Sequence, residues 1–191
     1  MKIYFVRHGE AMDDIRDEYG GWHDPELSPK GIEQANEAAK KLKLSGITVE
    51  KILSSPLVRA TQTAESFAIE FGVPVEKCVY LKERNTYGLL CGVNKTEAKE
   101  KYPELVLAYD EGKEVLGYEE YDFFVKRVKA LIEYLGKINQ DVIAVTHGKM
   151  LGAILTEIIG KKPVKIGDSC VIEMDLSEDN LTLVNSEGVE F

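Results

Sequence analysis

Hydrophobic and polar positions along the chain predict short strands separated by helices. Compact apolar runs bounded by charged or turn residues predict strands over Lys2–Val6, Lys51–Ser54, Lys77–Leu81, Asp141–Thr146, Cys170–Asp175 and Leu181–Asn185. Between them, apolar residues at helical spacing predict helices over Lys30–Leu44, Leu57–Phe71, Lys95–Tyr102, Tyr118–Lys137 and Gly148–Ile159. Such an order of elements is typical of an α/β protein with a mostly parallel sheet flanked by helices.

Two segments refine this picture. From Tyr121 to Leu135, apolar residues recur at the i, i+3, i+4 and i+7 spacing of a helix with one buried face. Three basic residues fall outside that face and are expected to point outward: Lys126, Arg127 and Lys129. The acidic stretch before this helix, Tyr109–Glu120, contains two glycines and is expected to form a surface loop or lid. Ser28 followed by Pro29 predicts a capped helix start.

Length and composition indicate one globular domain spanning residues 1–191. The hydrophobic share of 44% and the charged share of 30% are ordinary for such a domain. The chain contains no run near the roughly 20 apolar residues of a membrane span, and its start does not resemble a signal peptide. Its three cysteines are odd in number and widely spaced, so we expect a cytoplasmic protein.

The net charge of −9 argues against nucleic acid or an anionic membrane as a partner, but it permits a small anionic substrate. Only five of the 24 basic residues are arginines, and three of these lie in motif-like loops: Arg7, Arg59 and Arg84. The guanidinium group suits phosphate or carboxylate binding. From Ile166 to the end there is no Lys or Arg, so we expect no phosphate contact from that segment.

Two predicted strands end in a histidine followed by glycine. His8 follows Arg7 after the first strand, and His147 precedes Gly148 after the strand that begins at Asp141. Ligands of open α/β sheets bind beyond the carboxyl ends of the strands, so the two histidines are expected to meet there. Gly9 is expected to let a ligand approach the backbone closely.

These residue types suit phosphoryl transfer. A histidine can form a covalent phospho-enzyme, and the phosphoryl group then needs positioning and positive charge. Arg59, in the first turn of a predicted helix, lies near the same sheet edge, and the helix that opens at Gly148 favours an anion. Glu83 follows the predicted strand that ends at Leu81; beside a phosphate dianion, its carboxyl could protonate a leaving oxygen.

Five segments make the chain resemble the histidine phosphatase superfamily, in its phosphoglycerate-mutase-like branch, over essentially the full length: Val6–Glu10, Gly21–Gly31, Ser54–Ala64, Leu81–Glu83 and Thr146–Gly148. The resemblance implies a three-layer α/β sandwich. It implies that His8 is the phosphorylated nucleophile, that Arg7, Arg59 and His147 bind the phosphoryl group, and that Glu83 donates a proton and then activates water. It implies no metal and no organic cofactor.

The chain departs from the family pattern near the pocket entrance. Asp14 stands where many relatives have a phosphate-binding asparagine, so either it turns away or the entrance loop differs, and Arg16 could compensate. Cys91 stands where relatives frequently have an acidic residue. Trp22, Arg84 and Tyr87 are further candidates for the substrate pocket.

The favoured function is hydrolysis of a small phosphomonoester. The alternative is a phosphoglycerate mutase dependent on 2,3-bisphosphoglycerate, which would then be its cofactor. The segments at Gly21–Asp24 and Tyr87–Lys95 look mutase-like. Two features argue against the mutase. No arginine lies between Asn85 and Lys126, where mutases carry arginines for the substrate carboxylate. In addition, Lys149-Met150 stands where mutases have Asn-Ser after His-Gly.

Two further hypotheses belong to other classes. A metal site could combine His8, His23 and His147, but no clustered ligand spacing supports it. The other hypothesis is a module that binds phosphorylated ligands without turnover. The presence of all five expected catalytic and phosphate-binding residues argues against that module. The natural substrate and the oligomeric state are not predicted.

Overall fold

The computed structural model describes residues 1–177 and 180–191. In these residues a single six-stranded sheet has the order β3-β2-β4-β1-β5-β6. Its strands are β1 (Lys2–Arg7), β2 (Lys51–Ser54), β3 (Val75–Lys77), β4 (Val142–Thr146), β5 (Lys165–Ser177) and β6 (Asn180–Glu190). The first four strands in this order pair in parallel, whereas β5 pairs antiparallel with both β1 and β6. The sheet is therefore mixed, with a parallel majority.

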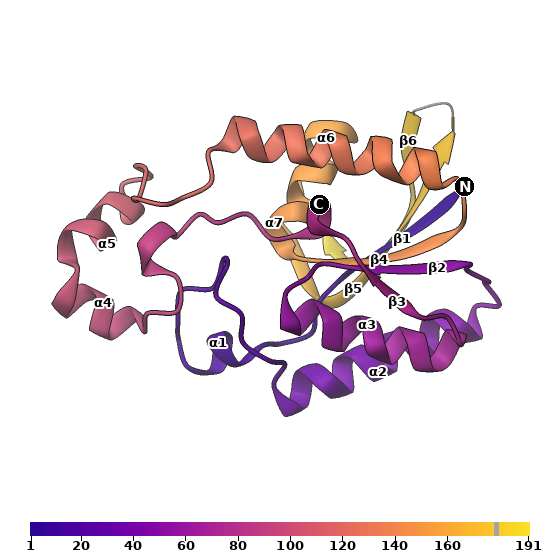
Figure 1. The fold of residues 1–191 in the computed structure, drawn as a ribbon, viewed down its shortest axis with the longest axis horizontal. Coiled ribbons are helices and arrows are strands. Elements are labelled where there is room, and N and C mark those ends of the chain that lie inside the picture. The colour runs from indigo at the N-terminus through magenta and orange to yellow at the C-terminus, as the bar shows by residue number, and fades with distance from the viewer. Residues whose placement is uncertain (178–179) are drawn as a thin grey trace.

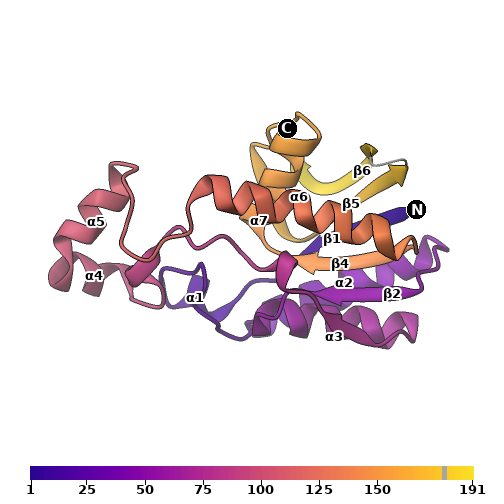
Figure 2. The ribbon, with the colours of Figure 1, turned by 45° about the horizontal axis from the view of Figure 1, so that its top comes forward.

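Helices cover both faces of the sheet, as Figures 1 and 2 show. The α-helices are α1 (Met12–Ile15), α2 (Pro29–Leu44), α3 (Val58–Phe71), α4 (Lys95–Lys101), α5 (Pro103–Asp110), α6 (Tyr121–Ile138) and α7 (Gly148–Ala153). A π-helical turn, η3 (Ile154–Ile158), continues α7, and η1 (Val79–Leu81) and η2 (Gly88–Leu90) are 3₁₀ turns. Within the described residues, no helix is both long enough and apolar enough to cross a membrane.

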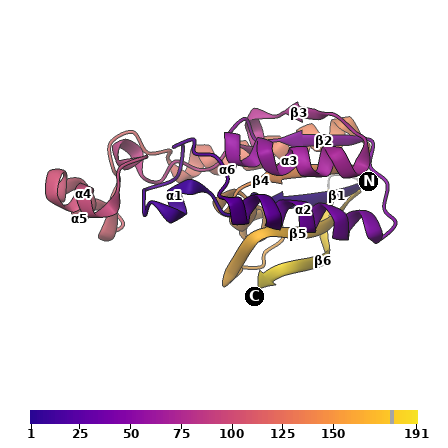
Figure 3. The same cartoon turned by 90° about the horizontal axis from the view of Figure 1, so that it is seen from below.

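Alternation of side chains along the central strands produces two cores. Ile3 and Phe5 of β1 pack with α6 and α7 on one face, whereas Tyr4 and Val6 pack with α2 and α3 on the other. The α/β sandwich of three layers predicted from the sequence is therefore present. Helices α4 and α5 project beyond one end of the sheet, and with Tyr19 and Leu90 they form a small third core (Figure 3).

The start of α2 matches its sequence pattern. Ser28 Oγ accepts a hydrogen bond from the Gly31 amide at 3.0 Å, and Pro29 is the first helical residue. Gly9 has a packing role beside the expected one, because a Cβ there would lie 2.3 Å from the Gly31 carbonyl oxygen. The absence of a side chain at Gly9 thus serves close packing of the β1 turn against α2.

Several predicted boundaries were wrong. The expected strand Lys77–Leu81 is not a strand: β3 ends at Lys77, and Val79–Leu81 forms η1. The expected loop Tyr109–Glu120 overlaps the end of α5 at Asp110, and α6 begins at Tyr121 instead of Tyr118. β5 and β6 are longer than predicted because they pair as an antiparallel hairpin that adds ladder bonds at both ends.

Candidate active site

The parallel strands bring three loops to one edge of the sheet. His8 follows β1, Ser55 follows β2 and His147 follows β4. Because β1, β2 and β4 run in parallel, their carboxyl ends meet, and the rings of His8 and His147 lie edge to face with centroids 5.0 Å apart. The two strand-ending histidines therefore lie together, in the crevice where ligands of α/β sheets bind.

His8 is oriented by its own backbone. Its Nδ1 lies 2.7 Å from the Gly9 carbonyl oxygen, which can only accept, so Nδ1 carries the proton. The lone pair therefore resides on Nε2, which receives a hydrogen bond from Nε of Arg59 at 3.2 Å. Burial and the nearby Arg59 and Arg7 guanidinium groups hold the pKa of His8 well below its usual range. A neutral imidazole whose lone pair is on Nε2 is the form that can attack phosphorus, once Arg59 releases that atom to the substrate.

His147 is completely buried at the end of β4. Its Nε2 lies 2.7 Å from Ser55 Oγ. Its Nδ1 has no hydrogen-bond partner among the described residues. Burial, followed by the charge of Arg59, lowers the pKa of His147 well below the ordinary value.

Arg59 lies in the first turn of α3 and is 2% exposed. Asp24 Oδ1 accepts a hydrogen bond from the Val58 amide at 2.6 Å and so caps this helix. Beyond its bond to His8, the Arg59 guanidinium donates to the carbonyls of Gly21 at 2.9 Å and His23 at 2.7 Å. Arg59 thus joins the nucleophile candidate to the loop that covers it.

Arg7 is held by the C-terminal part of the chain, which contacts this arginine and was not expected to contact a phosphate itself. Its Nη2 lies 3.1 Å from Asp168 Oδ1, and its Nη1 donates to the Ile166 carbonyl. A register irregularity in β5 between Ile166 and Val171 pushes this segment toward the site, and the Ser169 amide donates to the His8 carbonyl at 3.2 Å. This segment contributes no cation to the site; it contributes the oxygen acceptors that hold Arg7.

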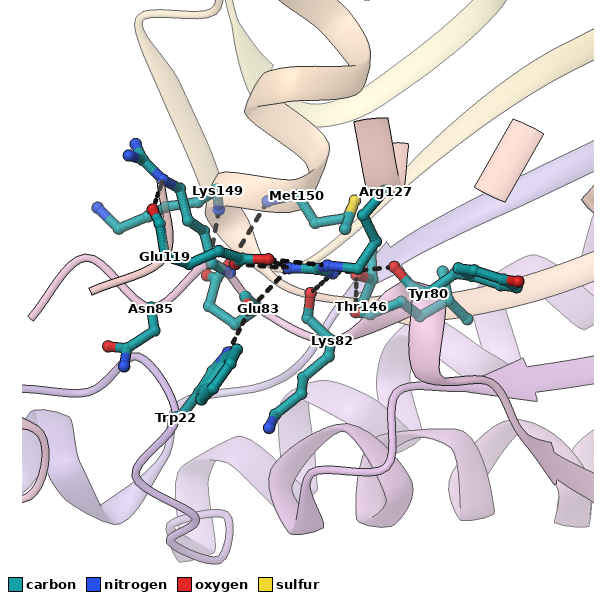
Figure 4. Close-up of polar contacts among 12 residues, drawn as sticks. Trp22, Tyr80, Lys82, Glu83, Asn85, Glu119, Arg127, Thr146, Lys149 and Met150 are labelled. Carbon is teal, nitrogen blue, oxygen red and sulfur yellow. Dashed lines mark hydrogen bonds and ion pairs between the residues drawn. The ribbon is translucent and has the colours of Figure 1, made fainter. Parts of the chain in front are cut away.

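Glu83 lies at the same edge of the sheet and is 8% exposed. Its carboxylate accepts hydrogen bonds from the main-chain amides of Arg84 at 2.9 Å and of Lys149 and Met150, each at 3.2 Å. The Lys149 and Met150 amides belong to the start of α7, so the helix start that was expected to favour an anion contacts the Glu83 carboxyl group. Figure 4 shows Lys149 and Met150 on one side of Glu83 and Trp22 on the other.

Arg127 contradicts the expected outward orientation. Its guanidinium donates hydrogen bonds to three main-chain carbonyls of the segment that leads to Glu83: those of Tyr80 at 3.1 Å, of Lys82, and of Glu83 itself at 3.2 Å. The same group forms a two-oxygen ion pair with Glu119, with contacts of 2.8 and 2.9 Å from Nη2 (Figure 4). Helical spacing missed this residue because a long arginine side chain can leave the apolar face of its helix and reach a neighbouring loop.

A cavity of about 740 Å³ opens over this edge of the sheet. Arg7, His8, Glu83 and Gly148 line it, together with the pocket candidates Arg84 and Tyr87. The other two pocket candidates do not line it. Trp22 supports the site from outside, where its Nε1 donates to the Glu83 carbonyl at 2.8 Å, and Arg16 is exposed.

The unusual Asp14 turns away from the site. It is exposed, and its Oδ2 accepts a hydrogen bond from the Ala11 amide at 3.2 Å, so its carboxylate serves the start of α1. The neighbouring Asp13 is the buried acid. Burial raises the pKa of Asp13, while the positive charge of Arg59 opposes that rise.

The three histidines of the metal hypothesis are not gathered at one point. His23 faces Glu18, with 3.1 Å between Nε2 and Oε2, and its carbonyl accepts from Arg59. Among the residues that the structure describes, no group of three or more His, Cys, Asp or Glu side chains is placed to hold a metal ion.

Comparisons with solved structures define the class of fold. The chain is similar to α-ribazole phosphatase from Shigella flexneri, with a TM-score of 0.84 and 23% identity over 97% of this chain and 96% of that one. It is also similar to phosphoglycerate mutase from Bacillus anthracis, with a TM-score of 0.80 and 22% identity over 98% and 92% of the two chains. The fold is therefore phosphoglycerate-mutase-like.

The family model for the histidine phosphatase superfamily (branch 1) matches residues 3–186, and the chain belongs to that superfamily. Curated relatives include 2,3-bisphosphoglycerate-dependent phosphoglycerate mutases. The one from Enterococcus faecalis is 29% identical over 92% of this chain and 90% of its own. The one from Bradyrhizobium diazoefficiens is 37% identical over 53% of this chain, and this match spans only half the length of that relative.

Proposed function

We propose that the protein hydrolyses a small phosphomonoester through a phosphohistidine on His8. The observation that carries the proposal is the tautomer of His8: with the Nδ1 proton engaged by the Gly9 carbonyl, the Nε2 lone pair is directed to the edge where Arg59 and Arg7 supply positive charge. Membership of the superfamily and the similarity to phosphatase structures support this activity.

The first step forms the phospho-enzyme. Arg7 and Arg59 bind the phosphoryl oxygens, and His147 donates a further hydrogen bond from its Nδ1 when that atom carries the proton. His8 Nε2 attacks phosphorus as the bond to the leaving oxygen breaks, and Glu83 gives that oxygen its proton. The products of this step are the alcohol and an Nε2-phosphohistidine.

The second step regenerates the enzyme. Glu83, now a carboxylate, takes a proton from water, and the resulting hydroxide attacks phosphorus as the bond to Nε2 breaks. Inorganic phosphate leaves, and Glu83 is protonated for the next cycle. Because all positive charge in this mechanism comes from protein side chains, we infer that it needs neither a metal ion nor an organic cofactor.

The test is hydrolysis of p-nitrophenyl phosphate in excess EDTA, with the His8→Asn variant beside the wild type. Turnover that resists EDTA and disappears in the variant is the expected result. Full activity in the variant, or loss of activity on chelation, would contradict the mechanism. The three cysteines are free thiols, two of them buried, which fits the reducing cytoplasm that we infer as its location.

The mutase remains the second candidate because the curated relatives named above carry that activity. A mutase needs the same phosphohistidine but must return the phosphoryl group to its substrate instead of to water. Conversion of 3-phosphoglycerate to 2-phosphoglycerate that depends on 2,3-bisphosphoglycerate, and is faster than phosphate release, would establish it. Release of phosphate without isomerisation would exclude the mutase and favour the phosphatase.

A further inference from the structure

The cavity over Glu83 has a charge opposite to that of the whole chain. Among the described residues that line it, five are cationic and one, Glu83, is acidic, although the chain carries 33 acidic and 24 basic residues. Arg7 belongs to the proposed phosphoryl site and is paired with Asp168. The other four cations lie in the wider cavity: Arg84, Lys149, Lys162 and Lys165.

Little in the described part of the chain neutralises these four groups. Within residues 1–177 and 180–191, Arg84, Lys149 and Lys162 form no ion pair. Lys165 lies 3.9 Å from Glu190, and both side chains are more than two-thirds exposed, so this contact contributes little. Arg84 is fixed by a hydrogen bond from its Nε to the Glu119 carbonyl at 3.2 Å, which leaves its two terminal nitrogens available.

The four cations come from three separate segments of the chain. Arg84 follows Glu83, Lys149 lies on α7, and Lys162 and Lys165 belong to the segment that leads to Ile166, whose carbonyl binds Arg7. Figure 4 shows the Lys149 side chain extending away from the Glu83 carboxylate that its amide contacts. The positive charge is therefore distributed around the cavity and extends from the phosphoryl site outward.

Two aromatic rings that line the cavity, those of Tyr87 and Tyr121, contact two of these cations. The Arg84 guanidinium carbon lies 4.9 Å from the centre of the Tyr121 ring, and Lys149 Nζ lies 5.5 Å from that of Tyr87. Such contacts hold the cations over apolar surface. A leaving group bound in this cavity would therefore contact both aromatic rings and positive charge.

We propose that the substrate is a phosphomonoester whose alcohol carries a second anionic group, a carboxylate or another phosphate, bound by Lys162, Lys165, Lys149 and Arg84. This inference rests on the proposed phosphatase function and adds the class of leaving group. A neutral alcohol would leave the basic wall without a partner, whereas a second anion forms charge-assisted hydrogen bonds with it.

The test compares n-propyl phosphate with 3-phosphooxypropanoate and propanediol bisphosphate. The wild type is expected to prefer both anionic substrates by about tenfold or more in kcat/KM, the effect of one or two charge-assisted contacts. That preference is expected to shrink at high salt. The double variant Lys162→Gln/Lys165→Gln is expected to lose most of it. Lys161→Gln removes a lysine that does not line the cavity and is expected to retain it.

Two outcomes would overturn the inference while the phosphatase stands. One is equal kcat/KM for all three substrates in the wild type. The other is an equal loss for all three in the double variant, because a basic rim that merely attracts phosphate would produce no selectivity.

A binding measurement separates the inference from the catalytic proposal. Propane bisphosphonate and propyl phosphonate cannot be hydrolysed, so calorimetric titration of the wild type compares them without turnover. The bisphosphonate is expected to bind about tenfold tighter. Equal affinities would overturn the inference. Tighter binding by a protein that hydrolyses none of the phosphomonoesters would uphold the anion site and refute the phosphatase.

Discussion

Nη2 of Arg127 donates a hydrogen bond to the main-chain carbonyl of Glu83 at 3.2 Å, and Trp22 Nε1 donates to the same oxygen at 2.8 Å. Because Arg127 also binds the carbonyls of Tyr80 and Lys82, it holds the whole loop that carries the proposed proton donor. The position of the Glu83 side chain therefore depends on a residue that does not line the cavity.

We predict that Arg127→Lys slows the proposed reaction most for poor leaving groups. Lysine keeps the charge but cannot bind three carbonyls and both oxygens of Glu119 with a planar fork. A displaced Glu83 would protonate the leaving oxygen less well, which matters more for alkyl than for activated aryl phosphates. We expect kcat/KM to fall about tenfold more for n-propyl phosphate than for p-nitrophenyl phosphate. Equal losses on both would show that Arg127 only stabilises the fold. Lys126→Met, a change at the adjacent exposed position, serves as the control.

Asp168 is predicted to position Arg7 through an oxygen acceptor. Asp168→Ala removes the partner 3.1 Å from Nη2, and we expect KM to rise about tenfold. Asp168→Asn keeps an oxygen acceptor in place and should retain a KM near that of the wild type. Steady-state kinetics with inhibition by inorganic phosphate checks both. If the Asn variant is as impaired as the Ala variant, the negative charge and not the acceptor is what matters.

The buried histidines predict an acid-sensitive fold. Both pKa values are lowered in the folded protein, so between those values and the unfolded value of about 6.5 the unfolded chain binds more protons. The stabilising contribution is therefore complete above about pH 6.5 and is lost as the pH falls. Each histidine contributes a slope of up to about 1.4 kcal/mol per pH unit to the free energy of unfolding. Urea titrations from pH 6.5 to 5 should give a shallower slope for His8→Asn and for His147→Asn. Parallel slopes in wild type and variants would contradict this account.

Close packing of α2 predicts that Gly31→Ala destabilises the protein. A Cβ at Gly31 would lie 2.0 Å from the Glu10 carbonyl oxygen, so the β1 turn or the helix must shift. We expect a loss of about 1–3 kcal/mol in the free energy of unfolding, the usual cost of overpacking. At Gly152, also helical, a Cβ meets nothing closer than Ile166 Cδ1 at 3.8 Å. Gly152→Ala is therefore the matched control, with an expected change near zero or slightly stabilising. Denaturant unfolding of both variants measures the difference, and equal stabilities would contradict the packing argument.

Sequence patterns predicted the elements that carry strong periodicity. The buried runs of β1 and β4 and the body of the amphipathic α6, though not its start, were placed correctly, because a central strand and a one-faced helix leave clear hydrophobic signatures. The four-residue β2 was also placed correctly, but β3 was not. β3 has three residues and no apolar run of its own, so the strand was predicted too far along the chain, toward Leu81.

The site residues also fall into those that the sequence predicted and those that it missed. His8, His147 and Arg59 stand at strand or helix ends, where topology alone brings them together. Arg127 and Asp168 reach the site through one long side chain and one irregularity in β5, and neither feature has a sequence period. Asp14 follows one of the two alternatives that the sequence left open: it turns away from the site and serves its own helix start.

The central claim is covalent phosphorylation of His8. The most direct test is intact-mass analysis at alkaline pH of the Glu83→Gln variant after mixing with p-nitrophenyl phosphate, because loss of the proposed base should slow hydrolysis of the intermediate more than its formation from an activated phosphate. We expect an increase by one phosphoryl group, mapped to His8 and absent in Glu83→Gln/His8→Asn. Turnover without this adduct, or an adduct on another residue, would contradict it.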